Sequence, residues 1–422
     1  MMIRSIRKAA AAGAAIAAGA LLLSACSGGS SGDSGSGSGE PITMWTRDVT
    51  ATQSQALVDA WNSSHDQKVK LTVVPAANYL QKVGVAAGAN DLPCLMASDV
   101  VYAPNFVQKG LWNDISDKVD SLSFKDALAP GHLEVSSKDG KTYAVPHTLA
   151  ISAIFQNDVL LEKAGIDPTA PVKSLAEFDA NAQKVAALGS DKVGFLFPSD
   201  SAGTLSFTMF PSIWAGGGEA LSKDGTKSLL DSDESIATFA AYNKMAKDGS
   251  APTSKTATGA TRNDVFAKGN VGYVLASNAV LQGVSDSDSV KIGVQAIPGA
   301  EGGSATFLGG DVMGISSSCK DVDGAWDFLK WSLGKEAQGD IYGKLNQLPV
   351  RSDIQNSDDP RIQALVDIIK DGRTPYSLRY AETFNDPQGP ALKVFRDALF
   401  GDDPAAALKA GNQSITDSLN QQ

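Results

Sequence analysis

The sequence has few of the residues that usually hold a metal ion. Its 422 residues include three histidines and three cysteines. His65, His132 and His147 lie far apart, and the chain contains no HExxH, CxxC or paired Cys/His spacing. Protein metal sites need several such ligands at suitable spacing. We therefore predict neither a metal site nor a cofactor.

Basic residues and long apolar runs are also scarce. The chain has 36 lysines and arginines against 47 acidic residues, a net charge of −11. Nucleic acids and anionic lipid surfaces attract proteins through lysine and arginine, so neither is expected as a partner. A membrane-spanning helix needs about 20 apolar residues, and no stretch after residue 25 provides them. The net charge of the chain does not determine the local charge of a binding cleft.

The N-terminus holds the one long apolar run. Arg4, Arg7 and Lys8 precede residues 9–23, which are Ala, Gly, Ile and Leu only. This run suits the apolar region of a signal peptide and is short for a membrane span. It ends in the sequence LSAC, which resembles the lipobox of bacterial lipoproteins and would make Cys26 the acylated mature N-terminus. The alternative is an ordinary cleaved signal with an incidental cysteine.

The segment after Cys26 predicts a tether. Residues 27–39 are Ser and Gly apart from Asp33, too little apolar surface to fold. A flexible chain of this length reaches roughly 20 Å. We therefore expect a signal peptide over 1–25, a lipidated tether over 26–40, and a protein anchored outside the cytoplasm through its lipid alone. Removing residues 1–25, with three basic and no acidic residues, takes the net charge to −14.

The rest of the chain, about 380 residues, exceeds one typical core and predicts two domains. Strand patterns over 41–46 and 68–74 alternate with a helical pattern over 50–64. Further along, 174–188 predicts a strong helix, with Ser174 as its N-cap. Strands that alternate with helices indicate an α/β fold with a largely parallel sheet.

Seven groups of short motifs follow one another along most of the chain. They are ITMWTRD at 42–48, GLWNDI at 110–115, KTYAVP at 141–146 with IFQNDVL at 154–160, IWAGGGE at 213–219, GNVGY at 269–273, LGGDVMGIS at 308–316 with GAWDFLK at 324–330, and QLPVR at 347–351. In this order and spacing they resemble the extracellular solute-binding proteins that include maltodextrin and other oligosaccharide binders. The last seventy residues match that family only loosely.

The resemblance implies a periplasmic-binding-protein-like fold of type II topology, with two α/β lobes joined by a hinge. The first lobe would hold residues 41–149 plus 309–350, and the second residues 150–308 plus 351–422. The crossings would lie near residues 150, 308 and 351. Such proteins bind their ligand between the lobes and close around it by a hinge motion.

Cys94 and Cys319 remain beyond Cys26, and an even number of cysteines in an exported protein permits one disulfide. In the family fold the strand that returns to the first lobe would pair residues 311–318 antiparallel with 94–98. The resemblance therefore implies a Cys94–Cys319 bond. The chain-entropy model assigns roughly 4–5 kcal/mol to closing so long a loop. The alternative is two buried free thiols.

Sugar binding needs apolar faces for the rings and donors and acceptors for the hydroxyls. Candidates at the carboxyl ends of predicted strands are Trp45, Arg47, Asp48 and Asp99, where open α/β sheets bind ligands. Asn278 follows a strand where family members often carry a binding aromatic. The remaining candidates are Phe207, Trp214, Gly217, Gly310, Asp311, Phe384 and Asn385.

Several candidates also have a purely structural interpretation. Trp45 and Phe207 could pack in the core, and Asp99 and Asn278 could cap the helices that follow them. Arg47 and Asp48 could form a solvated turn. For Trp214 a role in binding is favoured over core packing, since three neighbouring glycines would let a ligand approach the backbone.

The resemblance implies the oligosaccharide-binding subunit of an ABC importer, a monomer that is not an enzyme and whose partners are the permease subunits. One alternative is a surface-anchored glycoside hydrolase, which would need a carboxylate pair that no motif singles out. Another is a binder of a non-sugar solute such as a polyamine, using Asp48, Asp99 and Asp311. A third is an adaptor for a protein partner.

Overall fold

The computed structural model describes residues 39–196, 199–251, 258–259 and 261–421. Cys26 and the predicted signal peptide therefore lie outside the described residues, as does nearly all of the tether. A mixed sheet organises the described part, with strand order β2-β1-β3-β11-β6-β8-β7, and β9, β10 and β12 pair beside this path. The strands are β1 Ile42–Arg47, β2 Val69–Val74, β3 Leu95–Asp99, β6 Ala144–Asn157, β7 Val193–Leu196, β8 Val271–Ser277, β9 Ile292–Gln295, β10 Ile297–Pro298, β11 Ser304–Ile315 and β12 Gly372–Arg373, while β4 Ser137–Lys138 and β5 Lys141–Thr142 form a separate hairpin.

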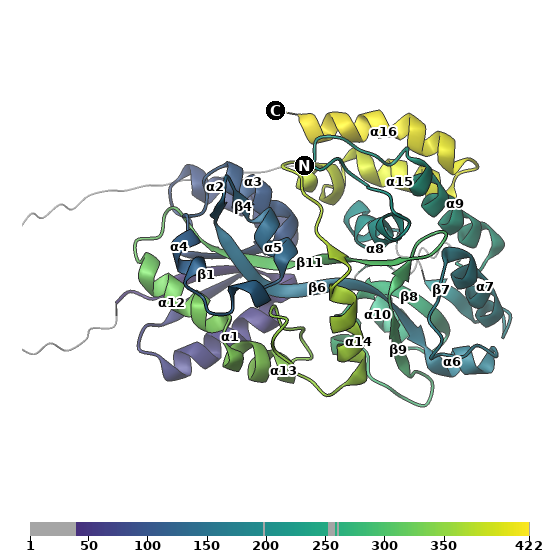
Figure 1. The fold of residues 1–422 in the computed structure, drawn as a ribbon, viewed down its shortest axis with the longest axis horizontal. Coiled ribbons are helices and arrows are strands. Elements are labelled where there is room, and N and C mark those ends of the chain that lie inside the picture. Colours follow the sequence, from purple (N-terminus) through teal and green to yellow (C-terminus); the bar gives the residue numbers. More distant parts are fainter. Residues whose placement is uncertain (1–38, 197–198, 252–257, 260, 422) are drawn as a thin grey trace, which may run out of the picture. The chain divides into compact units, whose positions relative to one another are not determined.

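Two long strands connect two groups of shorter ones. The β1 group contains β1, β2 and β3, all parallel, and the β8 group contains β7 and β8, also parallel. Strand β6 pairs with β11 over Ala144–Ile151 and then with β8 over Ser152–Gln156. The C-terminal part of β11, Asp311–Ile315, pairs antiparallel with β3. β6 and β11 therefore run side by side from one group to the other (Figure 1).

The crossing depends on one glycine. The register between β6 and β11 shifts between Asp311 and Val312. Gly310, beside this shift, has φ of +108°, and a Cβ there would lie 2.1 Å from the carbonyl oxygen of Thr148. A side chain at this position would collide with β6, so glycine is required.

The helices surround the two strand groups, and local sequence explains where they begin and end. Ser174 Oγ accepts from the Glu177 amide at 3.2 Å at the start of α7, and Gly249, with φ of +86°, ends α9. Among the described helices none is long and apolar enough to cross a membrane. Around the β1 group lie α1 Ala51–Ser64, α2 Ala76–Gly88, α3 Ala103–Gln108, α4 Ser116–Asp120, α5 Pro130–Val135, α12 Val322–Ser332 and α13 Tyr342–Lys344. Around the β8 group lie α6 Asp158–Lys163, α7 Leu175–Ala186, α8 Ala202–Ala215, α9 Asp233–Asp248, α10 Arg262–Phe266, α11 Val280–Gly283, α15 Pro390–Phe400 and α16 Pro404–Asn420, with α14 Pro360–Ile369 against β9 and β11.

The sheet has an apolar cluster on each face. Met96 of β3 belongs to one cluster and its neighbours Leu95 and Ala97 to the other, because successive strand residues point to opposite faces. Both clusters contain residues of both strand groups. The expectation of an α/β fold is confirmed. The sheet is parallel within each strand group but mixed as a whole, because β6 and β11 pair antiparallel with their neighbours in the strand order.

The β1 group is also linked covalently. Cys94, just before β3, and Cys319, just after β11, form a disulfide whose Cα atoms are 4.3 Å apart. Asp311–Ile315 pairs antiparallel with Leu95–Asp99, and the Ser316 amide donates to the Cys94 carbonyl at 2.9 Å. The bond closes a loop with a sequence separation of 225 residues, which contains the whole β8 group.

Candidate functional site

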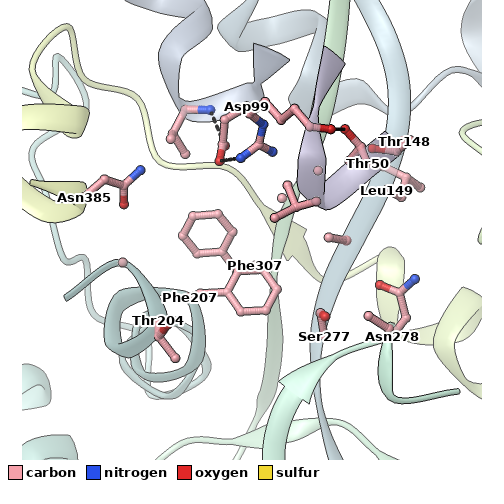
Figure 2. A pocket seen from close by; sticks show the side chains of 18 of the residues that line it. Thr50, Asp99, Thr148, Leu149, Thr204, Phe207, Ser277, Asn278, Phe307 and Asn385 are labelled. Atoms are coloured by element: carbon pink, nitrogen blue, oxygen red, sulfur yellow. Dashed lines mark hydrogen bonds and ion pairs between the residues drawn. The ribbon is translucent and has the colours of Figure 1, made fainter. Parts of the chain in front are cut away.

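A cavity of about 580 Å³ lies where β6 and β11 pass between the two strand groups. Its walls come from the carboxyl ends of β1, β3 and β8, from the first turns of α1 and α8, and from residues 148–150 and 309–310 at the crossing. Open α/β sheets bind ligands at this edge, and the volume falls within the range of small-molecule pockets. Figure 2 shows its polar side chains arranged around two phenylalanine rings.

One wall carries a buried charge cluster. Arg47 Nη1 lies 2.9 Å from Asp99 Oδ2, and Arg47 Nη2 forms a second ion pair with Asp311 Oδ1. Thr50 Oγ1 donates to Asp311 Oδ2 at 2.9 Å. Asp311 is fully buried behind the wall, while Arg47 and Asp99 reach the cavity.

Burial and the neighbouring charges set the protonation of this cluster. Burial alone would lower the pKa of Arg47, but the charges of Asp311 and Asp99 raise it overall. Burial raises the pKa of Asp99, and Asp311 adds to this, while Arg47 opposes it. Arg47 therefore stays charged and is held in place by two acceptors, with a fixed donor edge toward the cavity.

The opposite side of the cavity is aromatic. Phe207 of α8 and Phe307 of β11 have ring centroids 5.2 Å apart, and Trp214 packs on Phe307 from behind at 5.8 Å. Figure 2 places the two phenylalanine rings below Asp99. Phe207 is only partly buried and can offer a ring face to a ligand.

Amide side chains border the cavity near α11. Gln53 Nε2 donates to Gln347 Oε1 at 3.1 Å, and Gln282 Nε2 donates to the same oxygen at 3.0 Å. Asn278 is 2% exposed, and its Oδ1 accepts from the Ile151 amide at 3.0 Å. Asn278 therefore holds β6 against the end of β8 as well as lining the cavity.

The structure brings about half of the predicted site residues together. The cavity is lined by Arg47, Asp99, Phe207, Asn278, Gly310 and Asn385, and Asp311 lies directly behind it.

Besides Asp311, five predicted residues do not line it. Trp45 packs half-buried on the apolar cluster, with Lys82 Nζ 4.2 Å from its ring centroid. Asp48 Oδ1 instead accepts from the Ala76 amide at 2.9 Å, at the start of α2. Gly217, with φ of +85°, belongs to the turn that ends α8.

The other two are aromatic residues of the core. Trp214 is 6% exposed and Phe384 1% exposed, and both pack against Phe210. Local sequence does not separate an aromatic ring that faces a ligand from one that fills a core, and here the structure buries both rings outside the cavity lining. The cavity also contains residues that we did not predict, among them Thr50, Gln53, Arg262, Gln282, Phe307 and Gln347.

A second cavity of about 820 Å³ lies between α2, α3 and residues 378–387. It shares Val101 and Asn385 with the first, and Asn385 Nδ2 donates to Tyr102 Oη at 3.1 Å between them. Its lining is largely apolar, with Leu80, Phe106 and similar residues.

Two buried histidines lie behind the lining. His132 Nε2 is 3.0 Å from the Gly309 carbonyl oxygen, and His147 Nε2 is 2.9 Å from Ser54 Oγ. Burial lowers the pKa of each imidazole to about 4. Both are therefore neutral at pH 7 and act as hydrogen-bonding groups of the core.

We predict that acid destabilises the protein through these histidines. Between pH 6.5 and 4 the unfolded chain binds a proton at each histidine that the folded chain does not bind. The contribution of each neutral histidine to the free energy of unfolding is thus fully present above pH 6.5. It decreases as the pH is lowered, by about 3 kcal/mol for each histidine at pH 4. The raised pKa of Asp99 works in the opposite direction. Urea unfolding between pH 7.5 and 4 measures the slope.

His132→Gln separates this cause from general acid sensitivity. The variant should lose stability at pH 7.5 but show a shallower fall with acid, since one titrating group is gone. A slope equal to that of the unmodified protein would contradict the assignment.

The arrangement can hold a small polar solute. Among the described residues no group of three potential ligands lies close enough to hold a metal ion, and Asp99 is the one carboxylate in the cavity lining. A ring face opposite a wall of fixed donors and acceptors, between two strand groups, defines a solute-binding protein. The chain belongs to the bacterial extracellular solute-binding protein family, whose profile matches residues 56–368.

Several known proteins are similar to this chain in sequence or in fold. A binding protein of Brucella abortus (strain 2308) is 29% identical over 289 residues, 67% of this chain and 68% of that protein. The arabinooligosaccharide-binding protein of Bacillus subtilis (strain 168) is 24% identical over 360 residues, 80% of each chain. The GacH receptor of Streptomyces glaucescens GLA.O, solved unliganded and with acarbose, superposes with a TM-score of 0.76 at 20% identity, over 90% of this chain and 98% of that one. The fold is thus that of periplasmic-binding-protein-like proteins, and the family works outside the cytoplasm.

Proposed function

We propose that the protein binds an oligosaccharide in the 580 Å³ cavity and delivers it, unchanged, to the permease subunits of an ABC importer. The observation that carries this is the Phe207 ring in the same cavity as Asp99 (Figure 2), whose carboxylate pairs with Arg47. A pyranose ring needs both an apolar face and directional hydrogen bonds. The sugar ligands of the Bacillus and Streptomyces relatives support the same class of solute.

Delivery would use a hinge. In this proposal residues 41–149 plus 309–350 move against residues 150–308 plus 351–422, about crossings near residues 150, 308 and 351. The two strand groups joined by β6 and β11 support these boundaries. Gly309 and Gly310 lie in one crossing and in the cavity wall, so closure and ligand contact would be coupled there.

The anchor is proposed from the sequence. Cys26 would carry the lipid, and the Ser/Gly tract 27–39 would hold a monomeric binding domain near the permease. Membrane contact would be through the lipid only.

We also propose that the protein is not an enzyme. Glycoside hydrolysis uses two carboxyl groups on either side of the scissile bond, and Asp99 is the one carboxylate among the described residues of the lining. Labelled oligosaccharides should therefore be recovered intact after incubation. A polyamine ligand is not favoured, because Asp99 and Asp311 are both paired with Arg47.

A thermal-shift panel of oligosaccharides tests binding. A ligand present at 100 times its Kd should add about 2.7 kcal/mol of stability. If no saccharide shifts the melting temperature, the proposal fails.

We predict that Phe207→Ala weakens binding of the best saccharide about tenfold. Covering roughly 60 Å² of ring at about 25 cal/mol/Å² contributes about 1.5 kcal/mol, which corresponds to that factor. Isothermal titration calorimetry measures the Kd. Val85→Ala, at a 70% exposed position on α2, is the control and should leave it unchanged. An unchanged Kd in Phe207→Ala would exclude the ring as a binding surface.

A further inference from the structure

Arg262, the first residue of α10, lines the cavity and has no partner for its charge among the described residues. Its Nε is buried and has no hydrogen-bond acceptor in the described part of the chain. No carboxylate of those residues lies within ion-pair distance of its guanidinium. Burial lowers the pKa of Arg262, and Asp200 is the one charge that acts against this. Asp200 is exposed, and its Oδ1 accepts from the Gly259 amide at 2.9 Å.

Arg47, the other arginine in the cavity lining, has carboxylate partners for its charge. Arg47 has Asp99 and Asp311 as partners, and both carboxylates are committed to it. A buried guanidinium Nε–H without an acceptor is unfavourable, since arginine does not lose its proton. Buried polar groups without partners in a native structure call for an explanation. A ligand that supplies the acceptor would explain this one.

The surroundings of Arg262 offer further donors. Helix α8 begins beside the segment that leads into Arg262, since a Cβ on Gly259 would lie 3.1 Å from Thr204 Oγ1. Ser201, Gly203 and Thr204 of this first turn all line the cavity. The first turn of a 14-residue helix carries partial positive charge. Together with the unpartnered guanidinium, this part of the wall is suited to an anion.

We propose that the ligand carries a carboxylate that binds Arg262, which makes it an acidic oligosaccharide containing a uronic acid. This inference rests on the proposed function. A carboxylate can accept two parallel hydrogen bonds from a guanidinium. Phe207 and the Arg47–Asp99 pair would hold the sugar ring, and Arg262 would distinguish the acid from its neutral counterpart.

The test compares matched ligands by calorimetry on the full mature protein. The pairs are trigalacturonate with galactotriose, and glucuronyl-xylobiose with xylotriose. The acidic member of one pair should bind at least about tenfold more tightly at low salt. Arg262→Gln should remove this preference and leave the neutral member within about threefold, while Arg262→Lys should keep part of it, because lysine retains the charge without the bidentate geometry. Arg396→Gln, at an exposed position on α15, is the matched control and should change nothing.

A second measurement tests whether Arg262 instead stabilises the fold. Without ligand, Arg262→Gln should melt at or above the temperature of the unmodified protein, since it removes a partly buried charge that has no partner among the described residues. A clearly lower melting temperature would overturn the inference. So would equal or tighter binding of the neutral members, although the proposed function would stand. Failure of every saccharide, acidic or neutral, would instead remove the proposed function.

Discussion

Replacing Cys94 and Cys319 together by serine should lower the free energy of unfolding by about 4–5 kcal/mol. The bond closes a loop with a sequence separation of 225 residues, so its loss gives the unfolded chain much more conformational freedom. It also holds the start of β3 to the end of β11, the two strands that position Asp99 and Asp311. Urea unfolding of both proteins, with and without dithiothreitol, measures the effect.

The reductant provides the control. Dithiothreitol should destabilise the unmodified protein by a similar amount and leave the double serine variant unchanged. If the reduced and oxidised proteins unfold at the same urea concentration, the disulfide contributes no stability. Ligand binding below the unfolding transition should persist in the variant, because no cavity residue is altered.

The strands over 41–46 and 68–74 and the helices over 50–64 and 174–188 that we predicted agree with the structure to within a few residues. Helix α7 followed from its apolar period and from Ser174, whose cap hydrogen bond is present. The 14-residue strand β6 was not predicted. Thirteen of its residues are buried, all except Ala150, so it lacks the alternation of apolar and polar residues that identifies a strand. It forms because β11, β8 and β9 pair with it, and local sequence does not encode those distant partners.

The cavity was predictable where position along a strand decides which residues reach it. Arg47 and Asp99 end parallel strands, and the ends of parallel strands meet at one edge. Gln53, Gln282 and Gln347 come from separate helices and a loop, and no motif links them before the chain folds. Phe307 stands directly before the Leu308-Gly309-Gly310 motif, the one local signal that could have identified it.

Asp311→Ala should lower the free energy of unfolding by about 3–4 kcal/mol, because it leaves Arg47 buried with one of its two carboxylates. Thr50 Oγ1 would lose an acceptor as well. The released guanidinium should reorient, so ligand affinity should also fall. Chemical denaturation measures the first effect and calorimetry the second.

Two further variants show whether charge pairing is the cause. Asp323→Ala removes a carboxylate that is 90% exposed and paired with Lys118, so it should change stability by no more than about 0.5 kcal/mol. Arg47→Met combined with Asp311→Leu removes the buried cation together with its partner, and should recover most of the lost stability while binding stays weak. If the double variant is as unstable as Asp311→Ala, the packing of this wall determines its stability. Recovery of stability without recovery of binding would show that the Arg47–Asp311 ion pair is retained because it positions Arg47 for the solute.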